Sequence, residues 1–188
     1  SFSLFAFFII WMNYKDAIYF FNINQDYLQG ADVFFLLGMV TIIEMGTGVN
    51  GQIIATSTYW RFELWTSLML TALIIPLSYT LTVKYGIIGP AIANLVSFSI
   101  YNLIRYWFLY KKFNLQPFSG KTIEILIISV LSYSISYYAF VSSVGLWSMI
   151  GRSTLFIIIF ITLIYKRRIS PDFEPIIENA MKRLRLKK

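Results

Sequence analysis

The chain has 188 residues, of which 57% are hydrophobic and only 13% are charged. A soluble domain of this size carries roughly 25% charged residues, so the composition excludes an ordinary soluble domain and indicates an integral membrane protein. The net charge of +7 would suggest nucleic-acid binding in a soluble chain. Here the basic residues gather in connectors and in the tail, as they do in multi-pass membrane proteins, and we expect no nucleic-acid partner.

The chain contains no Cys and no His. Their absence removes thiolate metal sites, the commonest metal ligand and the commonest general base. We therefore expect no catalytic residue, no metal and no cofactor, and the protein is not expected to be an enzyme.

The first predicted element is incomplete. No signal peptide precedes the first apolar run, and we expect the chain to be the C-terminal part of a longer protein. The run Phe2–Asn13 is too short to cross a bilayer alone, so residues 1–14 are predicted to be a truncated transmembrane helix. A polar connector is expected over Lys15–Gly30.

Residues 31–113 are predicted to form three transmembrane helices. Their expected ranges are Ala31–Thr56, Phe62–Val83 and Ile87–Phe113, with a loop at Thr56–Glu63. The third helix holds 18 residues before its first charge at Arg105, close to the roughly 20 needed to cross a bilayer. The very short turn at Lys84–Gly86 makes the second and third helices antiparallel neighbours.

Residues 122–165 are predicted to form two additional C-terminal transmembrane helices, Thr122–Val141 and Leu146–Tyr165. Residues 166–188 form a basic cytoplasmic tail. Its apolar residues share one helical face, which fits an amphipathic helix on the membrane surface, but a solvated basic tail fits the composition equally well. The expected fold class is an all-α polytopic transmembrane helical bundle.

The distribution of cations predicts the orientation. If the connectors after alternate segments share a side, that side and the tail carry 13 Lys and Arg, against 3 on the other side, namely Lys15, Lys84 and Arg152. The positive-inside rule then places the C-terminus in the cytoplasm. We expect Arg105 to extend toward the cytoplasmic headgroups.

Glu44 is the candidate acid of a transport pathway. A carboxylate within an apolar span costs several kcal/mol unless it is paired or protonated, and it therefore suggests function. On a continuous helix it shares one face with small and polar residues, listed here as Thr41, Thr47, Gly48, Gly51, Gln52 and Ala55. This face could line a water-filled cavity, or its small residues could let another helix pack closely.

The stretch Gly46–Gly51 spells G-x-G-x-x-G, but a dinucleotide site would need a preceding strand. Within an apolar run, this stretch more plausibly marks a broken helix of the kind that transporters place at their sites. A second polar stripe lies on the predicted helix Ile87–Phe113 and comprises Asn94, Ser97, Tyr101 and Arg105. Of these, Asn94 is the candidate for lining a cavity.

On the predicted helix Thr122–Val141, the small residues Ser129, Ser132 and Ser136 predict close packing against another helix.

Residues 30–113 resemble the polysaccharide (O-antigen) flippases of the multidrug/oligosaccharidyl-lipid/polysaccharide exporter superfamily. The resemblance is carried by GVNGQIIATSTYWR at Gly48–Arg61, by the following helix with its Thr and Pro residues, and by KYGIIGPAIANLVSFSIYNLIRYWFLYKKF at Lys84–Phe113. These motifs are structural and suit the superfamily better than any one substrate.

The resemblance implies a fold of two pseudo-symmetric helical bundles. This chain would be most of the second bundle plus two extra helices, and the missing N-terminal half of the same chain would be its partner. The implied activity is the flipping of a lipid-linked oligosaccharide, the precursor of a polysaccharide such as the O-antigen of lipopolysaccharide. This transport would cross the bacterial cytoplasmic (inner) membrane by alternating access.

The implied path takes the sugar and diphosphate through a polar cavity while the lipid tail stays among membrane lipids. Glu44 is then the candidate for coupling to protons or cations, or for binding sugar hydroxyls. No basic residue is expected deep in a span, so a cationic site for the diphosphate is expected in the missing half.

Three alternatives remain open at this stage. A multidrug or peptidoglycan-precursor exporter of the same superfamily would share the fold. A membrane polysaccharide polymerase would need convergent acid and base groups, usually in a long external loop, and the external loops here are short. A structural membrane subunit would lack a continuous polar cavity.

Overall fold

The computed structural model describes residues 2–48, 50–116, 120–141 and 145–167. Within these ranges the chain forms α-helices and short 3₁₀-helices and has no strand, which confirms the all-α prediction. The helices are α1 (Phe2–Phe20), η1 (Gln25–Gly30), α2 (Ala31–Thr47), α3 (Asn50–Ala55), α4 (Trp60–Tyr85), η2 (Gly86–Ile88), α5 (Gly89–Phe113), α6 (Gly120–Ala139) and α7 (Leu146–Arg167). The chain divides into two compact units, Ser1–Ser119 and Gly120–Lys188.

Four helical stretches of the described chain are long and apolar enough to cross a membrane. They are Gln25–Thr47, Trp60–Phe113, Gly120–Ala139 and Leu146–Arg167. The second contains α4 and α5, of 26 and 25 residues, which reverse direction at η2. A helix of that length rises about 38 Å, more than the roughly 30 Å of a hydrocarbon core.

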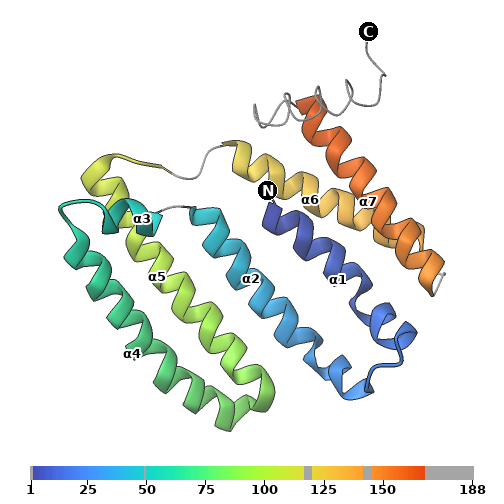
Figure 1. Ribbon diagram of the computed structural model, residues 1–188, viewed down its shortest axis with the longest axis horizontal. Helices are drawn as coiled ribbons and strands as arrows, with labels where there is room; N and C mark the ends of the chain where they lie inside the picture. The colour runs from blue at the N-terminus through green and yellow to red at the C-terminus, as the bar shows by residue number, and fades with distance from the viewer. Residues whose placement is uncertain (1, 49, 117–119, 142–144, 168–188) are drawn as a thin grey trace. The chain divides into compact units, whose positions relative to one another are not determined.

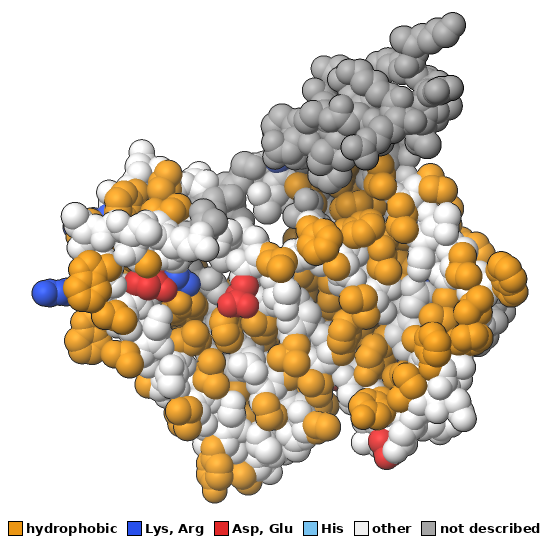
Figure 2. All heavy atoms as spheres, viewed as in Figure 1, with side chains coloured by type: hydrophobic (Ala, Val, Ile, Leu, Met, Phe, Trp, Pro, Cys, Tyr) orange, Lys and Arg blue, Asp and Glu red, His pale blue; other side chains and the backbone are white. Residues whose placement is uncertain are grey.

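Large apolar side chains are exposed along these helices, and hydrophobic atoms spread across the face that Figure 2 shows. Exposed apolar surface of this extent needs an apolar surrounding, since soluble monomers rarely expose contiguous apolar patches above a few hundred Å². The protein is a multi-pass helical membrane protein.

The first unit is built around α5. Helices α4 and α5 form an antiparallel hairpin, α2 packs on α5, and α1 packs on α2 (Figure 1). At the end where α4 begins, the rings of Phe62 and Phe108 stack with centroids 3.8 Å apart. At the far side, Phe7 of α1 stacks on Phe34 of α2, and Gly38 gives it room, because a Cβ there would lie 2.2 Å from the Phe7 ring.

Small residues bring α5 close to its neighbours. Ala91, Ala93 and Ser97 on α5 are almost fully buried. At the hairpin turn, a Cβ on Gly89 would lie 2.4 Å from the carbonyl carbon of Leu81, so the two backbones meet there directly. Membrane helices associate through this kind of close backbone packing, because lipid removes the usual hydrophobic drive between helices.

The second unit is the helix pair α6 and α7. Ser129, Ser132 and Ser136 on α6 are fully buried, as predicted for a packing face. On α7 the buried positions include Phe156 and Phe160, whose rings stack with centroids 5.6 Å apart. An ion pair of 3.7 Å between Glu124 and Arg167 links the start of α6 to the end of α7; both side chains are well exposed, so it contributes little stability.

The prediction that the first helix ends near residue 14 is wrong. Helix α1 continues through Lys15 and Asp16 to Phe20. Polar side chains do not end a helix when they can bond along it, and the Asn13 amide donates to the carbonyl of Ile9. The helix stops where the backbone changes, close to Asn22 with its positive φ of 50°. The predicted tail, residues 166–188, lies outside the described residues after Arg167.

A matched pair of glycine substitutions tests the hairpin turn. We expect Gly89→Ala to cost roughly 1–3 kcal/mol, because the new methyl meets the α4 backbone, which cannot move aside. Gly46→Ala on α2 adds a methyl that meets nothing within 4 Å, and we expect it to be neutral or slightly stabilising. Thermal unfolding of both variants in the same detergent measures the difference. Equal melting temperatures would show that the turn tolerates a side chain.

Candidate functional site

The break between α2 and α3, here called the junction, lies at the centre of the candidate site. Helix α2 ends at Thr47, Gly48 has φ 63° and ψ −135°, and α3 begins at Asn50. Only glycine adopts this backbone conformation readily. The predicted broken helix is therefore confirmed, and the assumption of one continuous helix over Ala31–Thr56 is wrong.

A buried hydrogen bond ties the end of α2 to α5. The Thr47 hydroxyl lies 3.0 Å from the Asn102 side-chain oxygen, and both residues are about 5% exposed. The Asn102 amide nitrogen also donates to the carbonyl of Phe98, at 2.9 Å. Asn102 retains a second N–H and a second oxygen lone pair, so it could bind a further polar group.

A largely buried ion pair lies one turn further along α5. Arg105 Nη2 donates to Glu63 Oε1 of α4 at 2.5 Å, and the side chains of Arg105 and Glu63 are 11% and 19% exposed. The Tyr101 hydroxyl donates to the same carboxylate oxygen at 3.2 Å. The guanidinium lies 4.4 Å from the centre of the Tyr101 ring, which adds a cation–π attraction.

The expectation that Arg105 extends toward the headgroups is wrong. Its side chain folds back over Tyr101, four residues earlier on α5, and so points away from the helix end. Helical side chains lean toward the N-terminus, which here brings the guanidinium to Glu63. The charge is stabilised by this contact instead of by water or lipid phosphate.

Gly51 of α3 makes room for the guanidinium. A Cβ at Gly51 would lie 1.7 Å from Arg105 Nη2, so no other residue fits without moving the arginine. The ion pair is thus enclosed by α3, α4 and α5 together. The small residue Gly51 belongs to the face that was predicted to line a cavity or to pack against another helix. In the structure it makes space for the charged side chain of Arg105.

The enclosed polar atoms are only partly satisfied. Glu63 Oε2, Arg105 Nε and Asn50 Nδ2 are buried and have no hydrogen-bond partner among the described residues. One acceptor and two donors are therefore free at the junction. Buried polar atoms are seldom left without partners, so this arrangement suits a polar ligand or a second conformation.

The structure brings some of the predicted pathway residues together and leaves others apart. Thr47, Gly48 and Gly51 form the junction. Glu44 and Gln52 are exposed on α2 and α3, and Asn94 is half-buried on α5. Asn94 precedes Asn102 by eight residues, about 12 Å along the helix, so it does not join the junction.

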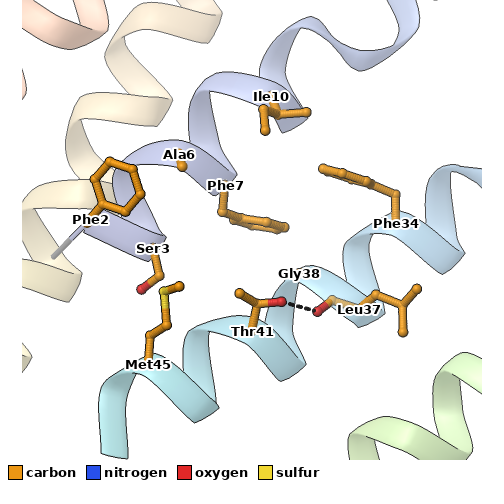
Figure 3. Close-up of a pocket in the computed structure, with 10 residues that line it drawn as sticks. All are labelled: Phe2, Ser3, Ala6, Phe7, Ile10, Phe34, Leu37, Gly38, Thr41 and Met45. Atoms are coloured by element: carbon orange, nitrogen blue, oxygen red, sulfur yellow. Dashed lines mark hydrogen bonds between the residues drawn. The ribbon is translucent and has the colours of Figure 1, made fainter. Parts of the chain in front are cut away.

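Two grooves flank α2. The first, of about 300 Å³, lies between α2 and α5 next to the Thr47–Asn102 hydrogen bond and is lined by Ile43, Thr47, Ser99, Asn102, Leu103 and Tyr106. The second, of about 260 Å³, lies between α1 and α2 and is almost entirely apolar (Figure 3). Its Thr41 hydroxyl donates to the Leu37 carbonyl, leaving a surface suited to hydrocarbon. The walls of the first groove are also mainly apolar, but four of its six lining residues, Thr47, Ser99, Asn102 and Tyr106, carry hydrogen-bonding groups, so it is the better candidate for a sugar.

A second arginine also lies inside a helix. Arg152 of α7 is 5% exposed, donates to the Ser148 hydroxyl at 3.1 Å and lies 6.0 Å from the Tyr137 ring centre. Both arginine side chains are buried against protein, but Arg105 lies about two turns from the end of α5 and Arg152 about two turns from the start of α7. The expectation of no basic residue deep in a span therefore stays a prediction. Removing these two from the connector counts takes one cation from each side, so the predicted asymmetry of charge remains.

Sequence reasoning missed Glu63 and Asn102. Glu63 was assigned to a loop, whereas α4 begins at Trp60 and places this carboxylate in its first turn. The stripe of Tyr101 and Arg105 was visible, but its acidic partner lies 42 residues away in the chain. The sequence did offer one signal for this pair: in two antiparallel helices joined by a short turn, an acid at the start of the first helix lies beside a base near the end of the second.

Comparisons with protein-family models, with curated proteins and with solved structures gave no match.

Removal of either charge should destabilise the protein. We expect Arg105→Met or Glu63→Leu alone to cost about 3 kcal/mol, because each leaves a buried charge without its partner. The double variant should cost less than the sum of the two by at least about 1 kcal/mol. Free energies of unfolding in detergent complete this cycle, with Lys84→Gln as an exposed control. Simple additivity would show that the two charges do not stabilise each other.

Proposed function

We propose that this protein transports a lipid-linked oligosaccharide across the cytoplasmic membrane of a bacterium. The observation that carries the proposal is the largely buried Arg105–Glu63 pair at the junction, between helices that are long and apolar enough to cross a membrane. Ionisable groups are costly within membrane spans and mark transport pathways by default. The proposal also draws on the resemblance of residues 30–113 to polysaccharide flippases.

The incomplete pairing of Arg105 supports a role in binding. Its contact with Glu63 uses one carboxylate oxygen and one guanidinium nitrogen, and Arg105 Nε remains free. A guanidinium in this state can donate to a phosphate oxygen without first losing all of its existing bonds. The diphosphate of a lipid-linked sugar has the matching charge. In this proposal Arg105 supplies the cationic site for the diphosphate, which was expected in the missing N-terminal half of the chain.

The broken helix supports movement at the same place. Transporters commonly place discontinuous helices at the substrate site, where unwound backbone lines a cavity. Here Gly48 interrupts the path from α2 to α3, and the groove between α2 and α5, with Thr47 and Asn102 in its lining, opens beside it. In this proposal the groove takes part of the sugar, while the apolar groove between α1 and α2 contacts hydrocarbon.

The alternatives predict different substrates. An exporter of drugs or of peptidoglycan precursors could use the same junction, and a complementation assay with exchanged substrates separates these cases. Coupling to protons or cations stays part of the proposal. Glu44 remains its original candidate, although in the first unit Glu63 contacts an arginine.

Substitution of Arg105 tests the proposal. We expect Arg105→Gln to lower the transport rate at least about tenfold, since a neutral amide loses the charge that pairs with diphosphate. Arg105→Lys should retain more activity than Arg105→Gln. The measurement is translocation of a fluorescent lipid-linked oligosaccharide by the full-length protein in liposomes, with surface polysaccharide in cells as a second assay.

Lys84→Gln, which removes an exposed cation at the other end of α4, is the matched control and should transport normally. Protein amounts in the membrane must match. Undiminished transport by Arg105→Gln would remove this residue from the mechanism, and undiminished transport by Glu44→Ala would do the same for Glu44.

A further inference from the structure

Three cations gather at the end of the first unit where α4 begins and α5 ends. Each lies over an aromatic ring: Arg61 over Trp60 at 5.6 Å, Lys111 over Trp107 at 5.0 Å, and Lys112 over Tyr59 at 5.5 Å. All six side chains are exposed. We call this set the basic–aromatic cluster.

Packing between helices holds the cluster together. Tyr59 meets Phe108 and Phe113 edge-on, with ring centroids 5.5 and 5.9 Å apart. Lys112 reaches from α5 to Tyr59, the residue just before α4, so the cluster spans both helices. Asn114, in the left-handed conformation, then ends α5. The cations are therefore presented by a folded corner of the molecule.

Charge differs between the two ends of this unit. Near the cluster the other described ionisable groups are Glu44, which is exposed, and the Arg105–Glu63 pair, whose charges offset each other. The opposite end carries Lys15, Asp16, Asp26, Asp32 and Lys84, so acids outnumber bases there. An anion is therefore attracted to the cluster end.

An apolar surface continues from the cluster along both helices. Leu64, Trp65 and Leu68 on α4 are 53%, 71% and 61% exposed, and Leu103 on α5 is 66% exposed. Cations at a helix end, aromatic rings beside them and exposed apolar side chains beyond match a phospholipid in that order: headgroup, interface and acyl chain. Free phosphate would use only the first part.

We propose that the basic–aromatic cluster binds the headgroup of an anionic phospholipid whose acyl chains lie along α4 and α5. The phosphate oxygens accept from Arg61, Lys111 and Lys112, and the rings fix these cations at the level of the interface. This site is separate from Arg105 and does not depend on the proposed transport.

Native mass spectrometry of the purified full chain with equal amounts of phosphatidylglycerol and phosphatidylethanolamine tests the site. We expect the wild-type protein to retain phosphatidylglycerol in preference. The triple variant Arg61→Gln/Lys111→Gln/Lys112→Gln should lose that preference by about tenfold or more, because each cation near a membrane surface contributes to anionic-lipid binding. The matching triple change to the other basic residue, Arg61→Lys/Lys111→Arg/Lys112→Arg, should keep most of it.

Lys84→Gln is the matched control, because Lys84 also lies over a ring, Tyr85, at 5.1 Å, but at the opposite end of α4. It should retain the wild-type preference. Equal loss in Lys84→Gln would show a general effect of charge and overturn the site, as would a wild-type protein without preference. Displacement of the lipid by millimolar inorganic phosphate would show a general anion site without specificity for a phospholipid, and it would also overturn the proposal. Unchanged melting temperatures confirm that the variants are folded.

Discussion

A charge inside an apolar helical bundle must find a partner, and the pairing of Arg105 with Glu63 meets this constraint here. Much of the local structure follows from it. Helix α4 must begin early enough to place Glu63 opposite Arg105, and α3 must present a residue without a side chain, Gly51. The chain must also turn at Gly48 to deliver α3 to that position. A few polar contacts thus specify how α2, α3, α4 and α5 fit together.

The sequence pattern located best those helices whose ends are marked by residues that break a helix, such as glycine and proline. The Lys84–Gly86 turn predicted the hairpin, and the structure has the expected elements within a few residues, with α5 beginning at Gly89 instead of Ile87. Helices α6 and α7 likewise match their predicted ranges closely. The end of α1 was missed because polarity at Lys15 and Asp16 was taken as a stop, although no backbone breaker occurs there.

The candidate site was only partly accessible to sequence reasoning. The G-x-G-x-x-G pattern at Gly46–Gly51 predicted the break, since glycine destabilises a helix interior. The contacts across the junction could not be found this way. Thr47 meets Asn102 across 55 residues of chain, and Glu63 meets Arg105 across 42. Helical periodicity shows which residues share a face, but it does not show which face another helix covers. Glu44 was therefore the predicted pathway acid, whereas Glu63, which contacts Arg105, was not predicted.

The contact at Gly89 has a mechanical consequence. Because the backbones of α4 and α5 touch at Leu81, neither helix can slide along the other without opening the turn, so the two form one rigid hairpin. Arg105 holds α3 against this hairpin beside Gly51, and α2 packs on α5 with the Thr47–Asn102 hydrogen bond at its end. Helix α2 can therefore move against the hairpin only by giving up that packing and that hydrogen bond.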